Sequence, residues 1–233
     1  MIISHRHKFI FVKTSKTAGT SIEIALSAIC GPKDIITPLA HADEKYRKSL
    51  GIPSAQNYHY SLPQYTKTDW LKFLYYKKLQ GFYNHIPALE IREHVEADIW
   101  NNYYKFCFER NPYDKVISWY YYWYNENYPP ILHFIKSGLA GQVRGFNLYT
   151  DPGGIPIVDK IYQFESIPTA FRDIEQRVGL QKNSLQLPPK KTKGKSRKDK
   201  RHYSQILSPE EAAWISKIFA REIKYFGYSF EEK

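Results

Sequence analysis

The stretch KFIFVKTSKTAGTSIEIALSAI, residues 8–29, sets the expected fold. Its first part, Lys8–Val12, is a short apolar run between polar residues, which predicts a buried strand. A turn with Gly19 follows, and the helical spacing of apolar residues in Thr20–Ile29 predicts a helix that ends at Gly31-Pro32. The stretch therefore reads as a strand that passes through a short loop into a helix.

The alternation of strand and helix continues along the chain. Two further strands are expected at residues 103–108 and 160–164. Further helices are expected over residues 42–50, 69–80, 87–95, 112–125, 168–178 and 208–225. This order predicts a single α/β domain over residues 1–233, a three-layer, P-loop-like arrangement with a central, mainly parallel sheet flanked by helices.

Positive charge is concentrated in one segment. The chain has 34 Lys and Arg against 23 Asp and Glu, a formal net charge of +11. Residues 190–201 (KKTKGKSRKDKR) hold eight bases and one acid, which is +7, whereas the other residues hold 26 bases and 22 acids, which is +4. A uniformly basic, histone-like coat is therefore excluded, and the segment favours an anionic partner.

The cysteines and the N-terminus bear on the compartment. Cys30 and Cys107 are the two cysteines, far apart and each within an apolar stretch. Disulfide frameworks and zinc sites need clustered cysteines, so neither is expected. The N-terminus lacks the apolar core of a signal peptide, and no apolar run reaches the roughly 18 residues of a membrane helix. We expect a soluble, cytoplasmic protein without a membrane anchor.

The segment KTSKTAGTS, residues 13–21, is predicted to bind an anion. Unpaired backbone N–H groups and the positive helix end gather where a strand passes into a helix. Lys16 adds a charge, and three hydroxyl side chains surround Gly19. The segment lacks the leading glycine of G-x-x-x-x-G-K-[ST], and its lysine precedes the glycine, so metal-assisted nucleotide hydrolysis is disfavoured. An ordinary helix-capping turn is the alternative interpretation.

A second candidate anion site begins at Arg110, at the end of the strand expected over residues 103–108. Arg110 would lie at the carboxyl edge of a parallel sheet, where α/β folds bind ligands, and its guanidinium suits bidentate contact with phosphate. We expect Ser118, two helical turns further on, to face the same anion. Alternatively, Arg110 pairs with Asp114, and Ser118 is only a small residue packed among aromatic side chains.

The two motifs together are specific. K-T-A-G-T-S (Lys16–Ser21) after an N-terminal strand, followed by R-N-P-x-D-x-x-x-S (Arg110–Ser118) after a later strand, resembles the sulfotransferase superfamily. The pattern is similar to the sulfotransferase family 2 type, which is related to Golgi carbohydrate sulfotransferases. The resemblance continues at Asn84–Ala88, Gln163–Glu165 and Phe226–Phe230, and it departs at Ser15, where the family usually has proline.

The resemblance implies a donor substrate, 3′-phosphoadenosine 5′-phosphosulfate (PAPS), and no metal. The first loop would hold the 5′-phosphosulfate through Lys16, Thr17, Ala18, Gly19, Thr20 and Ser21. Arg110 and Ser118 match the residues that bind the 3′-phosphate in the family. The basic segment would close over the donor, with Arg197 or a neighbouring lysine at the 3′-phosphate and Tyr203 packed nearby. An ordinary solvated loop is the alternative for this segment. Lys16 would stabilise the leaving phosphate.

Sulfuryl transfer to a hydroxyl also needs a base. Histidine suits this role because its ordinary pKa is about 6.5. His85 matches the position of the proposed catalytic histidine in family members with a similar motif, so His85 and Lys16 are the predicted catalytic residues. His59 is the second candidate base. A purely structural role for His85, capping the helix that follows, is the alternative.

The predicted function is sulfuryl transfer from PAPS to an acceptor hydroxyl on a carbohydrate. The eight bases of residues 190–201 exceed what one nucleotide needs, which favours an acceptor that already carries sulfate or carboxylate. Aromatic residues at helical spacing in Trp119–Tyr128 predict core packing for Tyr120 and Tyr124, with a sugar-stacking platform as the alternative.

Two other classes of function stay open. One is a different P-loop transferase or kinase, which the missing G-K-[ST] disfavours. The other is a protein that binds nucleic acid through residues 190–201. The balanced charge elsewhere and the lack of a nucleic-acid motif disfavour it, so no nucleic acid partner is expected.

Overall fold

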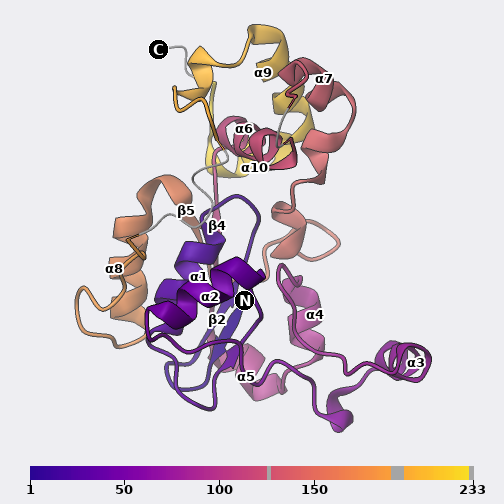
Figure 1. The fold of residues 1–233 in the computed structure, drawn as a ribbon, viewed down its shortest axis with the longest axis vertical. Coiled ribbons are helices and arrows are strands. Elements are labelled where there is room, and N and C mark those ends of the chain that lie inside the picture. The colour runs from indigo at the N-terminus through magenta and orange to yellow at the C-terminus, as the bar shows by residue number, and fades with distance from the viewer. Residues whose placement is uncertain (125–126, 190–196, 231–233) are drawn as a thin grey trace.

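The computed structural model describes residues 1–124, 127–189 and 197–230. Within these ranges five strands form one sheet, in the order β3-β1-β2-β4-β5, and helices cover it on both faces (Figure 1). The strands are β1 (Ile2–Ser4), β2 (Phe9–Val12), β3 (Ile35–Ile36), β4 (Tyr104–Glu109) and β5 (Lys160–Gln163). The α/β class and the three strands expected from the sequence are confirmed.

The sheet is mixed, which corrects the expectation of a mainly parallel one. β2, β4 and β5 run parallel, whereas β1 is antiparallel to both β2 and β3. Residues 5–8 alone join β1 to β2, and so short a connection allows only an antiparallel hairpin. The Asp34 carboxylate holds this turn by accepting hydrogen bonds from the backbone N–H of His5 (2.7 Å) and of Arg6 (3.1 Å).

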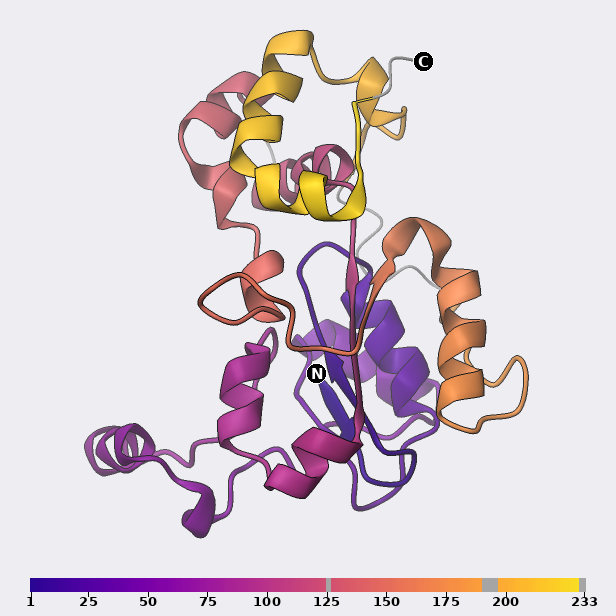
Figure 2. The same ribbon diagram turned by 180° about the vertical axis from the view of Figure 1, so that it is seen from behind.

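Alternate residues of the central strands feed two separate cores. Phe9 and Phe11 of β2 pack with α1 (Gly19–Ser27) and α8 (Ile167–Arg177) on one face of the sheet. Ile10 and Val12 point to the opposite face, whose cover is seen in Figure 2. That cover includes α4 (Ala88–Glu93), α5 (Ala97–Asn102) and the chain around Phe146–Tyr149. The expected three layers are therefore present.

A third core lies beyond the carboxyl end of β4, at the top of Figure 1. It is built from α6 (Pro112–Trp123), α7 (Ile131–Lys136), α9 (Pro209–Ile218) and α10 (Ala220–Phe226). One continuous helix was expected over 208–225, but the helix breaks at Phe219, which has non-helical dihedrals. The capping box at Ser208 is present, with its hydroxyl accepting from the Glu211 N–H at 3.3 Å.

The remaining helices are α2 (His41–Ser49) and α3 (Lys67–Tyr76), at the margins of these cores, and several single turns. α2 is tied to α1 through the fully buried Arg47, which donates to the Ser27 hydroxyl at 3.3 Å. α3 projects away from the body of the molecule (Figure 1). Short 3-10 turns are η1 (Leu62–Gln64), η2 (Leu139–Gln142), η3 (Phe146–Leu148), η4 (Phe164–Ser166) and η5 (Tyr203–Gln205). Cys30 and Cys107 are buried and unpaired, as expected.

Candidate active site

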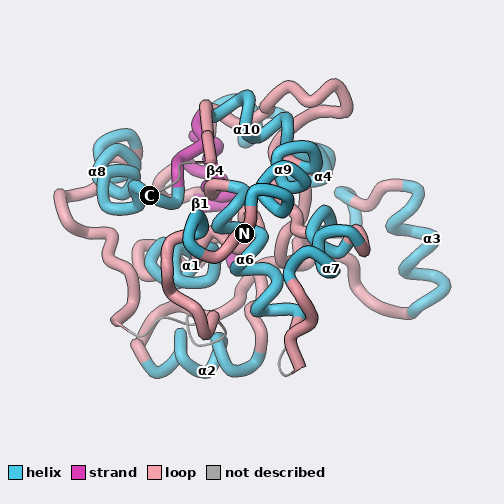
Figure 3. The backbone as a smooth tube through the Cα atoms, turned by 90° about the horizontal axis from the view of Figure 1, so that it is seen from above, coloured by secondary structure: helices cyan, strands magenta, loops and turns pink. Residues whose placement is uncertain are grey.

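The carboxyl ends of β2 and β4 border a cavity of about 840 Å³. Figure 3 looks down on the molecule from this end of the sheet. The cavity wall is formed by the loop after β2, the first turn of α1, one face of α6 and the residue after β5. Residues 187–189, Arg197 and Lys200 complete this part of the wall. Among the described residues, its lining includes no acidic side chain but six basic ones: Lys13, Lys16, Arg110, Arg144, Arg197 and Lys200. Such a lining favours an anionic ligand.

The loop between β2 and α1 is held in a strained shape. Lys16 and Ala18 have left-handed φ values of 62° and 56°, a conformation that costs about 1–2 kcal/mol for a residue other than glycine. The Thr14 hydroxyl donates to the Phe108 carbonyl of β4, and the Ser15 N–H donates to the Arg144 carbonyl at 3.0 Å. These contacts fix the loop from two sides, and strain of this kind concentrates at ligand sites.

The first turn of α1 faces the cavity. The cavity lining includes Ala18, Gly19, Thr20 and Ser21. The backbone N–H groups at the start of a helix have no acceptor within the helix, so they are available to a ligand. A Cβ on Gly19 would lie 2.9 Å from the Lys13 Cγ, so the glycine lets the helix start close to the strand end. Thr17 does not line the cavity. Its hydroxyl lies 3.0 Å from the Thr14 hydroxyl and stabilises the loop from inside.

A buried ion pair supports the loop from below, and the sequence analysis did not single it out. Lys13 is 2% exposed, and its Nζ lies 2.7 Å from the Glu23 Oε2 of α1. Burial raises the pKa of Glu23, but the Lys13 charge and hydrogen bond, the N-terminal ammonium and Arg47 together outweigh burial and hold that pKa below its usual value. The position of Lys13 directly after the strand could have suggested a cavity residue, whereas its partner depends on the tertiary fold.

Arg110 connects the two predicted motifs. Its Nη1 donates to the Lys16 carbonyl at 3.0 Å, and its guanidinium lies 4.2 Å from the centre of the Phe164 ring. Its Nε donates to the Asp114 carboxylate at 2.8 Å, so the pairing considered as an alternative does occur, while Arg110 also lines the cavity. The Asp114 carboxylate accepts from the Arg197 guanidinium as well.

Asp114 therefore stands between two arginines from distant parts of the chain. Burial raises the pKa of Asp114, but Arg110 and Arg197 together lower it by more. The pKa of this carboxyl therefore lies below its usual value. Arg197 is the first described residue after 190–196, and residues 190–196 of the basic segment lie outside the described part of the chain. The described end of that segment thus reaches the cavity, through Arg197 and Lys200.

The aromatic helix α6 serves both the core and the cavity. Tyr120 is buried in the third core and Tyr124 packs against it, as predicted. Ser118, Trp119 and Tyr122 line the cavity instead. The Trp119 and Tyr122 rings are stacked with 5.3 Å between centroids, and the Lys16 Nζ lies 4.4 Å from the Tyr122 ring centre. Core packing is thus confirmed for Tyr120 and Tyr124, while Trp119 and Tyr122 place a stacked pair of rings at the cavity.

His85 also lines the cavity, with its ring fixed by a single hydrogen bond. Its Nδ1 lies 3.0 Å from the Lys13 carbonyl oxygen, which can only accept, so Nδ1 carries the hydrogen. In the neutral ring, Nε2 is then left with the lone pair. Burial, followed by the charge of Lys13, lowers the pKa of His85 to about 4, so the ring is neutral at pH 7. The residue also has a left-handed φ of 60°.

The two remaining predicted residues lie elsewhere. His59 is exposed, pairs with Gly81 through the backbone, and is absent from the lining of the described cavity. Tyr203 does not line the cavity but is buried in the third core, where its ring stacks on Tyr113 with 5.6 Å between centroids. Sequence reasoning missed Gln142 and Arg144 of the lining, because a segment that carries no motif delivers them. Phe164 also lines the cavity, and sequence reasoning assigned it no role beyond its place in the Gln163–Glu165 resemblance.

The fold and the site define an α/β protein with one cationic, histidine-containing cavity at the sheet edge. The chain belongs to the sulfotransferase family, whose sequence model matches residues 1–143. The match includes the first loop, His85, Arg110 and Ser118, whereas the resemblances at 163–165 and 226–230 lie outside it. A protein of Archaeoglobus fulgidus, described as uncharacterized, is 34% identical over 100 residues, which are 41% of this chain and 83% of that protein.

The described residues offer neither a membrane-spanning helix nor a metal-binding cluster. Within residues 1–124, 127–189 and 197–230, no helix has the length and apolar character to cross a membrane. In the same ranges no three histidine, cysteine or carboxylate side chains cluster in a way that could hold a metal ion.

Proposed function

We propose that this protein transfers a sulfuryl group from PAPS to the hydroxyl of a carbohydrate. One observation carries the proposal: a single cavity unites the loop 13–21, Arg110 with Ser118, and a neutral histidine. The loop follows β2 and Arg110 follows β4, so two strand ends bring cationic groups to one cavity, and PAPS carries two separated anionic groups. Membership in the sulfotransferase family supports the same chemistry.

The residues present fit the donor in charge and in space. The cavity volume lies within the range of about 300–1,000 Å³ that is typical of small-molecule sites. The α1 N-terminus and Lys16 would hold the phosphosulfate, and Arg110, Ser118 and Arg197 would hold the 3′-phosphate. The bound donor supplies an activated sulfuryl group on a phosphate leaving group. Lys16 would then stabilise the negative charge that develops on that phosphate.

His85 is the proposed base. Its Nδ1–H is held by the Lys13 carbonyl, so Nε2 is the nitrogen that can accept the proton of an acceptor hydroxyl. Because burial and Lys13 keep the pKa near 4, His85 is in its proton-accepting form throughout the neutral pH range. Lys13 thus contributes through both its backbone and its charge.

The acceptor side of the proposal is supported by the face of α6. The stacked Trp119 and Tyr122 rings offer an apolar surface beside the cavity on which a sugar ring could pack. Arg144 and Lys200 line the same cavity and suit an acceptor that carries carboxylate or sulfate. A cationic cavity with an aromatic wall favours such an acidic carbohydrate over a neutral small alcohol.

Donor binding is tested by calorimetric titration with 3′-phosphoadenosine 5′-phosphate. We expect micromolar binding that is at least roughly tenfold tighter than that of ADP, which lacks the 3′-phosphate. Arg110→Ala should abolish the preference for the 3′-phosphate. Arg177→Ala is the matched control, because Arg177 also pairs with an aspartate four residues away but does not line the cavity. Equal binding of both nucleotides would refute the donor assignment.

Catalysis is tested by transfer of labelled sulfate to a panel of neutral and acidic glycans and small alcohols. His85→Ala should abolish turnover while the affinity for 3′-phosphoadenosine 5′-phosphate stays nearly unchanged. His59→Ala is the control and should retain activity, since His59 lies away from the cavity. Substantial turnover by His85→Ala would move the base to another residue.

A further inference from the structure

α3 is the most exposed apolar element in the described part of the chain. Figure 1 shows it extending sideways from the body of the molecule. Its large apolar side chains are unusually open to solvent, with Leu71 exposed to 69% and Tyr75 to 80%. Leu74, Tyr76 and the following Leu79 are also more than half exposed. So many exposed apolar residues on one short segment indicate an interaction surface.

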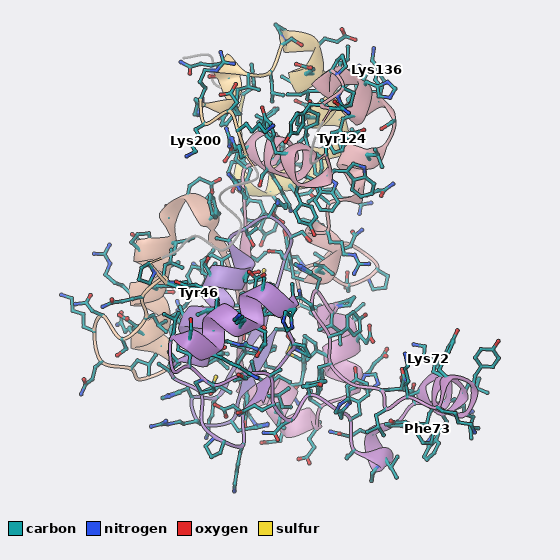
Figure 4. All side chains as sticks on the ribbon, in the orientation of Figure 1. Tyr46, Lys72, Phe73, Tyr124, Lys136 and Lys200 are labelled. Carbon is teal, nitrogen blue, oxygen red and sulfur yellow. The ribbon has the colours of Figure 1, made fainter. Side chains whose placement is uncertain are left out.

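The helix is anchored along one side only. Asp69 is buried, and its carboxylate accepts a hydrogen bond from Thr66 and lies 2.8 Å from the His94 Nε2. Phe73 follows on the same side and packs against the second core. Figure 4 shows Phe73 and Lys72 on opposite sides of α3. The anchoring contacts therefore fix the helix and leave its outward side to another partner.

The outward side combines apolar residues with lysines. Leu71, Leu74 and Tyr75 have the i, i+3, i+4 spacing of one helix face. Four exposed lysines flank them: Lys67, Lys72, Lys77 and Lys78. Because Asp69 is buried, every exposed charge in residues 66–80 is positive. Within the described chain no carboxylate forms an ion pair with these lysines.

We propose that α3 docks this protein onto an anionic lipid bilayer. Leucine and aromatic side chains insert at the boundary between headgroups and acyl chains, while lysines meet negatively charged headgroups. α3 projects from the body of the molecule, which leaves it accessible to a lipid surface. Lysines are depleted at the core of protein–protein interfaces, whereas here four of them flank the apolar residues, so a lipid surface is favoured over a protein partner. The proposal does not depend on the donor or the acceptor.

Co-sedimentation with vesicles tests the proposal. The full-length protein should bind vesicles of phosphatidylserine and phosphatidylcholine at least roughly tenfold more tightly than pure phosphatidylcholine vesicles. Replacing Leu71, Leu74 and Tyr75 together by serine should reduce this binding to that of the neutral vesicles. Ile155→Ser with Tyr225→Ser is the control, since both side chains are more than half exposed on other parts of the surface. Equal affinity for the two kinds of vesicle would overturn the proposal.

The contribution of the lysines must be separated from that of the basic segment 190–201. Replacing Lys67, Lys72, Lys77 and Lys78 by glutamine should weaken binding to the anionic vesicles roughly tenfold or more. The charge-matched control replaces four exposed lysines elsewhere, namely Lys33, Lys45, Lys48 and Lys224. Binding that survives both the serine and the glutamine variants would place the lipid contact outside α3 and overturn the proposal.

A fluorescent probe reports the docking directly. Both native cysteines are buried, so a thiol-reactive, polarity-sensitive dye should label an introduced Tyr75→Cys selectively. Its emission should shift to the blue when anionic vesicles are added, whereas the same dye at Ile155→Cys should not respond. Sedimentation of the protein without vesicles measures its oligomeric state and tests the alternative that α3 contacts a second copy of the chain. Dimerisation that is lost in the serine variant, with no vesicle response, would assign the face to a second copy and refute lipid binding.

Discussion

The loop after β2 and the corner around Arg110 form two sides of one cavity, yet they are held in different ways. The loop rests on a fully buried ion pair and on backbone hydrogen bonds to neighbouring segments. The corner consists of two arginines that share the partly exposed carboxylate of Asp114. The loop is therefore preorganised, whereas the arginines can exchange a carboxylate for the phosphate of a ligand.

Removing a charge beneath the loop should give the largest effect. Glu23→Gln leaves the Lys13 ammonium buried without its carboxylate, which should lower the free energy of unfolding by about 3–5 kcal/mol. Urea unfolding at neutral pH measures the change. Because the folded pKa of Glu23 is depressed, its stabilisation is present above the unfolded pKa of about 4.3 and is lost as the pH falls through the lower, folded value.

An exposed pair provides the control for this substitution. Glu210 pairs with Lys136 at 2.8 Å on the surface, so Glu210→Gln should leave the urea midpoint almost unchanged. Similar losses for Glu23→Gln and Glu210→Gln would show that the buried pair does not support the loop, and the contrast between loop and corner would disappear.

Residues 144–145 hold the loop after β2, because the Arg144 carbonyl accepts from the Ser15 N–H. A substitution in this segment should give the next largest effect. A Cβ on Gly145 would lie 2.2 Å from the Lys115 Nζ, which is itself buried and 2.6 Å from the Glu109 carboxylate. Gly145→Ala should destabilise the fold by about 2 kcal/mol and should also weaken donor-analogue binding, because Arg144 holds Ser15.

Gly141→Ala is the matched control for the clamp. An added Cβ there meets the Ile218 Cγ2 at 3.6 Å, which is an ordinary contact, so thermal unfolding should change little. If the Gly145→Ala protein has the stability and donor-analogue binding of the native chain, residues 144–145 do not stabilise the loop after β2.

The sequence predicted the local parts of this site better than the long-range parts. The loop and Arg110 follow strands directly, so strand ends and motif spacing located both. Glu23 beneath Lys13, and Arg144 above Ser15, depend on how distant segments pack. Arg197 was expected near the 3′-phosphate only from the family resemblance. Its contact with Asp114 required the structure.

The errors in the predicted fold also have a physical origin. β1 and β3 contain three and two residues, too few to show a hydrophobic period, yet they make the sheet mixed. The break at Phe219 was missed because α9 and α10 both have helical composition. No proline or glycine marks the break in the sequence. Long periodic segments were located within a few residues.

The pH dependence of turnover tests whether the pKa of His85 differs from that of an ordinary histidine. An unperturbed base with a pKa of about 6.5 would be mostly protonated at pH 5.5, whereas His85, with its pKa near 4, stays neutral. The rate at pH 5.5 should therefore stay close to the rate at pH 8, whereas an ordinary histidine base would leave roughly a tenth of it. Initial rates between pH 5 and pH 8 measure this, with His59→Ala expected to give the same profile. A midpoint near 6.5 would contradict the burial of His85 in the working enzyme.

Asp114→Asn should have the smallest effect and the opposite sign. In the proposed donor complex the carboxylate would compete with the bound phosphate for Arg110 and Arg197, so its neutralisation should raise the affinity for 3′-phosphoadenosine 5′-phosphate about threefold. The amide oxygen still accepts one hydrogen bond, which limits the loss of alignment. Calorimetric titration at two salt concentrations measures the gain, which should shrink at the higher one. A tenfold loss of affinity would instead mean that Asp114 holds the arginines in place, and that the corner is as rigid as the loop.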